Sequence, residues 1–174
     1  MSNTKSGRTV KIMAVCTGNI CRSAMAEVVL LDEADKLVAE KLSTSFEIAS
    51  SGVSSEEQGN CMDYRAQDTL RRHGYTSSLI STHRASRITS SEIKAFDLFL
   101  PMTSSHANSL VRLKVPKNKI YMWRWFESFG DNPLLADDLA DPWYGDIGDF
   151  EVVLRQIKQS AENILRWADE HVKT

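Results

Sequence analysis

The segment VKIMAVCTGNICRS, residues 10–23, decides how this chain folds. Its first six residues form an apolar run of the kind that fills a parallel strand buried on both faces. A tight loop follows. Over residues 23–42 apolar side chains recur at three- and four-residue steps, which predicts a helix. A second short strand is expected over residues 46–50, so the segment predicts the start of a right-handed βαβ unit.

Candidate N-cap residues recur along the rest of the chain and predict where further helices begin. Asp63, Thr89 and Thr103 each precede a short segment with helical spacing, and Thr89 has the capping-box form. The connection over residues 125–144 is long and rich in aspartate, and a loop of this length inside a domain is usually functional. Residues 150–168 keep one apolar face and predict a long final helix.

Two further strands are expected over residues 97–100 and 119–123. Strands that alternate with helices favour a parallel sheet. The sequence therefore predicts one doubly wound, flavodoxin-like α/β domain with a four-stranded parallel sheet and helices on both faces. We expect this domain over residues 9–174, after a flexible N-terminal lead-in at residues 1–8.

Composition narrows the function classes. The 174 residues carry 21 basic and 23 acidic side chains, a net charge of -2, which gives no electrostatic case for nucleic acid or a membrane as partner. No apolar run approaches the roughly 20 residues of a membrane span. Three cysteines, two of them in the loop, do not make a disulfide framework. With a polar start that lacks a signal h-region, we expect a cytoplasmic protein.

The loop after the first strand has the chemistry of an anion site. Cys16 stands at the carboxyl end of a parallel strand, where ligands bind in such sheets, and next to a helix N-terminus that attracts anions. Gly18 and Asn19 readily adopt left-handed backbone and can turn successive N–H groups inward. Arg22 adds a planar two-donor fork that matches phosphate oxygens.

The same surroundings favour a reactive thiol. A helix N-terminus and a fixed cation promote the thiolate form of a cysteine. We therefore expect Cys16 to attack phosphorus, and Ser23 to donate a hydrogen bond that helps the sulfur depart. A lone cysteine before a helix is more often a packing residue, but the whole string over residues 15–23 favours catalysis.

The string VCTGNICRS resembles the C-x5-R-S signature of the low-molecular-weight protein tyrosine phosphatases. The resemblance extends from residue 10 to the C-terminus. It includes SSG at 50–52, DYRA at 63–66, HRASRIT at 83–89 and DPWYG at 141–145.

The resemblance implies hydrolysis of phosphotyrosine in proteins, and of small aryl phosphates, through a phosphocysteine intermediate without metal or cofactor. Cys16 would be the nucleophile and Arg22 would stabilise the transferring group. Spacing alone cannot choose among the aspartates of the long connection, but the Asp-Pro motif points to Asp141 as the general acid. The loop residues that would bind the phosphoryl group are Thr17, Gly18, Asn19, Ile20, Cys21 and Ser23. A monomer or a weakly self-associating dimer is expected.

Further roles follow from the same resemblance. Asn19 would hold the loop in shape with the help of Ser50 and His83. Trp143 and Tyr144 would wall the cleft and stack on the phenol ring.

Some positions depart from the family pattern. Ala24 replaces a common proline, and Thr103 replaces an aspartate that lies near the active-site arginine in relatives. Glu56 and Glu57 occupy a place where many relatives have a tryptophan.

Cys21, in contrast, matches a family cysteine that pairs reversibly with the nucleophile under oxidation.

Three alternatives stay open at the sequence level. A protein arginine phosphatase shares the scaffold, although Ile20 goes with aryl phosphate in this family and threonine with phosphoarginine. An arsenate reductase needs a downstream cysteine pair, and Cys61 is the single cysteine there. A phosphate-binding pseudo-enzyme is disfavoured by the intact Cys16, Arg22 and Asp141.

Overall fold

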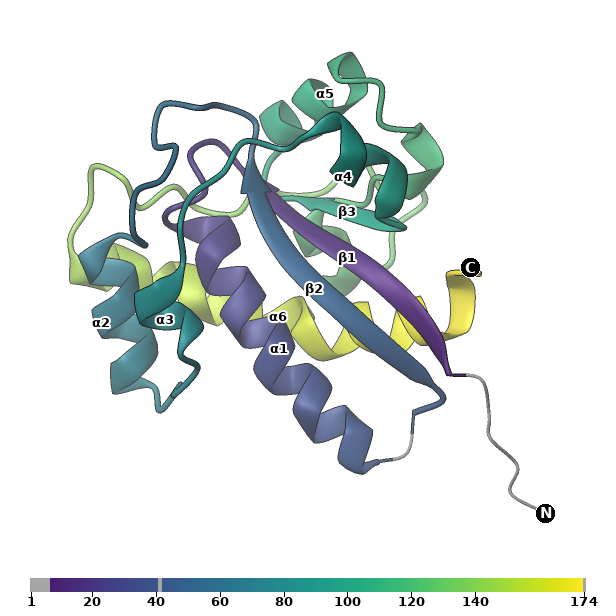
Figure 1. The fold of residues 1–174 in the computed structure, drawn as a ribbon, viewed down its shortest axis with the longest axis horizontal. Helices are drawn as coiled ribbons and strands as arrows, with labels where there is room; N and C mark the ends of the chain where they lie inside the picture. The colour runs from purple at the N-terminus through teal and green to yellow at the C-terminus, as the bar shows by residue number, and fades with distance from the viewer. Residues whose placement is uncertain (1–6, 41, 174) are drawn as a thin grey trace.

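A parallel sheet lies at the centre of the computed structural model, which describes residues 7–40 and 42–173. Within these residues the strand order is β2-β1-β3 (Figure 1). The strands are β1 (Arg8–Cys16), β2 (Thr44–Gly52) and β3 (Leu98–Pro101). The register runs from Arg8 opposite Thr44 to Cys16 opposite Gly52, and from Ile12 opposite Leu98 to Val15 opposite Pro101. Residues 12–15 of β1 are fully buried, which explains their apolar run.

Helices flank this sheet, and α1 packs against β1, β2 and α6. The helices are α1 (Arg22–Ala39), α2 (Tyr64–Arg72), α3 (Leu79–Thr82), α4 (Ser90–Ala95), α5 (Ser104–Arg112) and α6 (Ile147–His171). The three predicted caps are confirmed: Asp63 accepts from Arg65 N, Thr89 forms a capping box with Glu92, and Thr103 accepts from His106 N.

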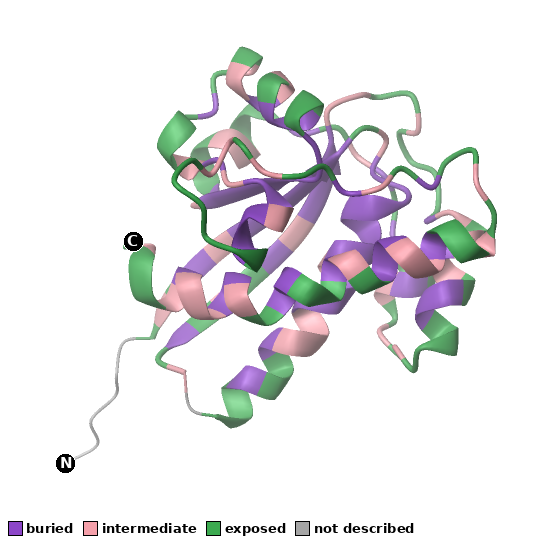
Figure 2. Ribbon diagram, turned by 180° about the vertical axis from the view of Figure 1, so that it is seen from behind, coloured by how far each residue is buried: buried purple, intermediate pink, exposed green. Residues whose placement is uncertain are grey.

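The apolar face of α6 completes the core. Buried positions recur along the helix between exposed ones (Figure 2). They face α1, α2 and the 3-10 helix η2 (Trp123–Glu127). The fully buried Trp123 donates its indole N–H to the Ile157 carbonyl at 3.2 Å, which anchors η2 on α6. None of the helices in the described ranges is long and apolar enough to cross a bilayer.

The prediction of a four-stranded sheet is wrong for the described part of the chain. Residues 119–123 make a single parallel bridge, Ile120 with Phe99, and do not continue as a strand. The backbone leaves the sheet because Met122 N donates to the Pro133 carbonyl instead, at 2.9 Å. In the chain, the 3-10 helix η1 (Lys117–Lys119) precedes this bridge and η2 follows it.

Several predicted boundaries also differ from the structure by a few residues. The helix expected over residues 23–42 ends at Ala39. Of the predicted lead-in, residues 1–6 lie outside the described residues, and Arg8 already belongs to β1.

The carboxyl ends of the strands are tied together. Val53 N donates to the Cys16 carbonyl and Ser54 N to the Thr17 carbonyl, both at 3.0 Å. On the other side Met102 N donates to the Val15 carbonyl at 3.1 Å. The segments after β2 and β3 thus both bind the end of β1, and this edge is where the candidate site forms.

Gly52 tests how tight this junction is. A Cβ at Gly52 would lie 2.5 Å from the Thr17 carbonyl oxygen, whereas one at Gly130 would meet nothing within 4 Å. We expect Gly52→Ala to lower the free energy of unfolding by about 1–3 kcal/mol, the usual cost of overpacking. Gly130→Ala, the matched control, should change it by less than about 0.5 kcal/mol. Urea denaturation measures both, and equal effects would contradict the close approach.

Candidate active site

The loop between β1 and α1 wraps around the sulfur of Cys16. Asn19 N donates to Cys16 Sγ at 3.3 Å, and Ser23 Oγ lies 3.0 Å from the same sulfur. These two partners can stabilise negative charge on the sulfur, because both can donate hydrogen bonds to it.

The buried side chain of Asn19 holds this loop in its shape. Its φ of 61° is left-handed, a conformation that asparagine tolerates better than most residues. Its amide nitrogen donates to Ser23 Oγ and Ser50 Oγ, both at 2.9 Å, and its Oδ1 accepts from Ser86 N at 3.0 Å. Asn19 is fully buried, and its bonds to Ser23 and Ser50 are buried with it.

A second layer of polar groups supports Asn19. The His83 Nε2–H donates to the Asn19 carbonyl at 2.6 Å, and Ser50 donates to Glu27 Oε2. Burial raises the pKa of Glu27 to about 7, although the Ser50 hydrogen bond opposes this. Burial also lowers the pKa of His83. Both shifts favour neutral groups beneath the loop.

Arg22 is buried at the start of α1. Its Nη1 donates to the Leu139 carbonyl at 3.3 Å, and its Nη2 lies 3.6 Å from Asp141 Oδ2. Leu139 N in turn donates to the Met102 carbonyl at 2.8 Å. The long connection therefore reaches back to the end of β3 and holds the guanidinium in place.

Asp141 begins a wall that closes one side of the site. Its Oδ1 accepts from Trp143 N at 3.1 Å, and 61% of its side chain is exposed. Arg65, which is paired with Asp63, donates to the carbonyls of Gly145 at 2.8 Å and Trp143 at 3.2 Å. The start of α2 thus positions the Asp-Pro segment that is about eighty residues away in sequence.

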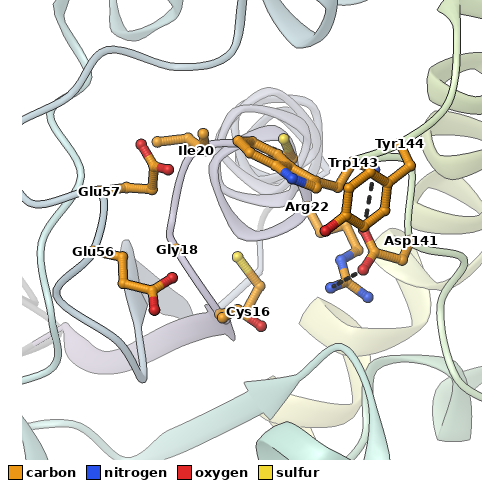
Figure 3. Close-up of a pocket in the computed structure, with 11 residues that line it drawn as sticks. Cys16, Gly18, Ile20, Arg22, Glu56, Glu57, Asp141, Trp143 and Tyr144 are labelled. Carbon is orange, nitrogen blue, oxygen red and sulfur yellow. Dashed lines mark hydrogen bonds and ion pairs between the residues drawn. The ribbon is translucent and has the colours of Figure 1, made fainter.

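The side chains converge on a pocket of about 280 Å³ (Figure 3). Cys16 and Arg22 lie at its base. Asp141, Trp143 and Tyr144 stand on one side, and Glu56 and Glu57 on the other. The remaining lining residues are Thr17, Gly18, Ile20 and Cys21.

The other predicted site residues lie outside the pocket lining. Asn19, Ser23, Ser50 and His83 are buried and belong to the support described above. Burial raises the pKa of Cys21, with the charge of Asp63 adding to the effect, which keeps this second thiol protonated.

The sequence does not identify two polar groups near the site, the half-buried Glu27 and the buried His106. Glu27 lies one helical turn after Ser23, a spacing that could have placed both on one face of α1. His106, from the first turn of α5, contacts Thr17, and no local pattern signals that contact. Among the described residues no three His, Cys, Asp or Glu side chains gather as metal ligands. The cation in the pocket lining is Arg22.

Comparison with known proteins identifies the family. The sequence model of the family "Low molecular weight phosphotyrosine protein phosphatase" matches residues 11–174. The low molecular weight protein-tyrosine phosphatase A of Mycobacterium bovis is 35% identical over 158 residues, 91% of each chain.

Solved structures agree in fold. A protein tyrosine phosphatase from Entamoeba histolytica superposes with a TM-score of 0.77 at 26% identity, over 92% of this chain and 97% of that one. The YwlE arginine phosphatase superposes with a TM-score of 0.78 at 21% identity, over 93% and 97%, a likeness in fold alone. On the family model and the sequence relative together, this chain belongs to the low molecular weight phosphotyrosine protein phosphatase family.

Proposed function

We propose that this protein is a protein tyrosine phosphatase, which hydrolyses phosphotyrosine and small aryl phosphates through a phosphocysteine intermediate. One observation carries the proposal. The Cys16 sulfur, with its two hydrogen-bonding partners, shares one pocket with an Arg22 guanidinium that lies 3.6 Å from Asp141. Nucleophile, anion-binding cation and candidate acid are therefore assembled around a space that fits a phosphoryl group.

The first step transfers the phosphoryl group to sulfur. The Cys16 thiolate attacks phosphorus as the bond from phosphorus to the phenolic oxygen breaks. Arg22 and the loop N–H groups stabilise the charge on the equatorial oxygens. Asp141 gives its proton to the leaving oxygen, because a phenolate departs poorly without one.

The second step frees the enzyme. Water attacks the phosphorus of phosphocysteine while Asp141, now a carboxylate, accepts a proton from it. The bond from sulfur to phosphorus breaks, and the thiolate is received by Ser23 Oγ and Asn19 N, at 3.0 and 3.3 Å from Sγ.

Aryl phosphate is the substrate class that the pocket supports best. Trp143 and Tyr144 stand at the mouth, with 41% and 97% of their surfaces exposed, and offer ring faces to a phenol. Ile20 adds an apolar side chain to the lining, and the family resemblance associates isoleucine at this position with aryl phosphate.

Peptides of one sequence that carry either phosphotyrosine or phosphoarginine distinguish the two activities. Faster release of phosphate from the phosphoarginine peptide would overturn the proposal.

We extend the proposal to the protein's setting. The natural substrates are phosphotyrosine-containing proteins, and the location is cytoplasmic, since all three cysteines are free and the nucleophile must stay reduced. The enzyme acts as a monomer or a weakly self-associating dimer, because one chain supplies the whole pocket lining.

Substitution of the two reacting groups tests the mechanism. We expect Cys16→Ser to abolish hydrolysis of para-nitrophenyl phosphate without added metal, while inorganic phosphate still binds. Asp141→Asn should slow kcat on phenyl phosphate by about 10²–10⁴-fold, the usual contribution of a general acid. The loss should be smaller on para-nitrophenyl phosphate, whose leaving group needs less protonation.

Asp137→Asn is the matched control for Asp141→Asn, since Asp137 is an exposed aspartate of the same connection. It should leave both rates unchanged. An active Cys16→Ser protein, or an Asp141→Asn loss that is independent of the leaving group, would refute the assigned roles.

The carboxylates of Glu56 and Glu57 should influence which substrate charge the enzyme prefers, because they line the mouth that a phosphate dianion must enter. We expect Glu56→Gln/Glu57→Gln to raise kcat/KM for phenyl phosphate by about 2–5-fold at low ionic strength. The same variant should lower kcat/KM for phosphotyrosine peptides with neighbouring lysines.

Structural damage would lower both values, so the opposite signs identify a charge effect. Asp35→Asn, an exposed aspartate on α1, serves as the control and should change neither value. A fall in both values for Glu56→Gln/Glu57→Gln would contradict the expectation.

A further inference from the structure

We infer that His106 is a positioning residue: its neutral imidazole donates from Nε2 to Thr17 Oγ1 and so leaves the Thr17 hydroxyl hydrogen free for the phosphoryl group. The inference rests on the proposed function, because it gives Thr17 a substrate that only a phosphoryl-transfer site supplies. The mechanism above uses the loop N–H groups and Arg22, and it assigns no role to either side chain of this pair.

His106 is fixed in space before its ring makes any contact. It lies in the first turn of α5, where its backbone N–H donates to the Thr103 cap at 3.2 Å. The residue is 4% exposed, and its Nε2 lies 2.8 Å from Thr17 Oγ1, a good hydrogen-bonding distance. A helix that follows β3 therefore contacts the residue next to the nucleophile at the end of β1.

The surroundings of the ring keep it uncharged. Burial, together with the positive charge of Arg22, lowers the pKa of His106 to about 4. Asp141 and Asp138, from the long connection, oppose this shift without cancelling it. Near neutral pH the ring therefore carries one proton, on one of its two nitrogens.

The position of that proton follows from the other nitrogen. His106 Nδ1 is buried and has no hydrogen-bonding partner in the described residues. A proton on Nδ1 would add a buried, unsatisfied donor to a ring that already experiences the positive charge of Arg22, whereas an unprotonated Nδ1 avoids this cost. The proton therefore belongs on Nε2, which donates to Thr17 Oγ1.

This tautomer sets what Thr17 can do. Its oxygen accepts from His106, so its own hydrogen is free to donate, and Thr17 lines the pocket beside Cys16. The Thr17 carbonyl is held as well, by Ser54 N at 3.0 Å. A hydroxyl fixed in this way donates a hydrogen bond to a phosphoryl oxygen, and such bonds to charged groups are among the stronger ones.

The tautomer is measured directly on the unaltered protein. Nitrogen-15 NMR of the imidazole rings separates protonated from unprotonated nitrogens, and loss of one signal set in His106→Leu assigns the residue among the four histidines. We expect a proton on Nε2 at pH 7 and no titration between pH 5.5 and 8. A proton on Nδ1, or a titration near pH 6.5, would overturn the inference whatever the enzyme's substrate.

A double-mutant cycle tests the coupling to phosphate. Thr17→Val, which keeps the shape but removes the hydroxyl, should weaken binding of inorganic phosphate and lower kcat/KM by about tenfold. His106→Leu should lower kcat/KM by about 3–10-fold in the native background and by less than about 2-fold in the Thr17→Val background. Thr17→Ser should restore most of the activity.

His171→Leu, at the end of α6 and away from the pocket, is the matched control and should leave kcat/KM unchanged. Losses that simply multiply in the double variant, or unchanged phosphate binding in Thr17→Val, would refute the inference. Failure of the unaltered protein to hydrolyse any aryl phosphate would instead refute the proposed function.

Discussion

The left-handed backbone of Asn19 is the constraint on which the site depends. At a φ of 61° the chain turns sharply enough to direct an N–H at the Cys16 sulfur. Such a conformation costs energy for a residue other than glycine and persists only where its surroundings hold it. Here α1 and β2 supply Ser23 and Ser50, and the segment after α3 supplies the carbonyl partner His83. The anion loop is therefore shaped by tertiary contacts as much as by its own sequence.

Charge is distributed unevenly across this assembly. Beneath the loop, burial raises the pKa of Glu27 to about 7 and lowers the pKa of His83, so near neutral pH both groups carry less charge than they would in water. Above the loop lie the guanidinium of Arg22 and the carboxylates at the mouth. A charged carboxylate below would compete with the substrate for the loop N–H groups and for Arg22. A support with reduced charge leaves more of those donors to the phosphoryl group.

Local chemistry explains which features were predictable. The caps at Asp63, Thr89 and Thr103 are confirmed because a cap is decided within four residues. The strand expected over residues 119–123 has the right propensity, but the indole of Trp123 and the N–H of Met122 find partners outside the sheet. In the site, the loop string predicts a thiol and a guanidinium by itself. The choice of Asp141 needed the family resemblance, because its partner is 119 positions away.

Thr103 departs from the family pattern, and this departure bears on how the charge of Arg22 is neutralised. The family resemblance leads us to expect an aspartate at this position, whereas Thr103 caps α5 and Arg22 donates to the Leu139 carbonyl. Within the described residues the carboxylate paired with Arg22 is Asp141, which is mostly exposed and therefore well screened. A buried guanidinium with weak neutralisation keeps more of its field for an incoming phosphate. Burial is the main reason that His106 stays neutral beside this loop, and the same field of Arg22 also disfavours a second cation there.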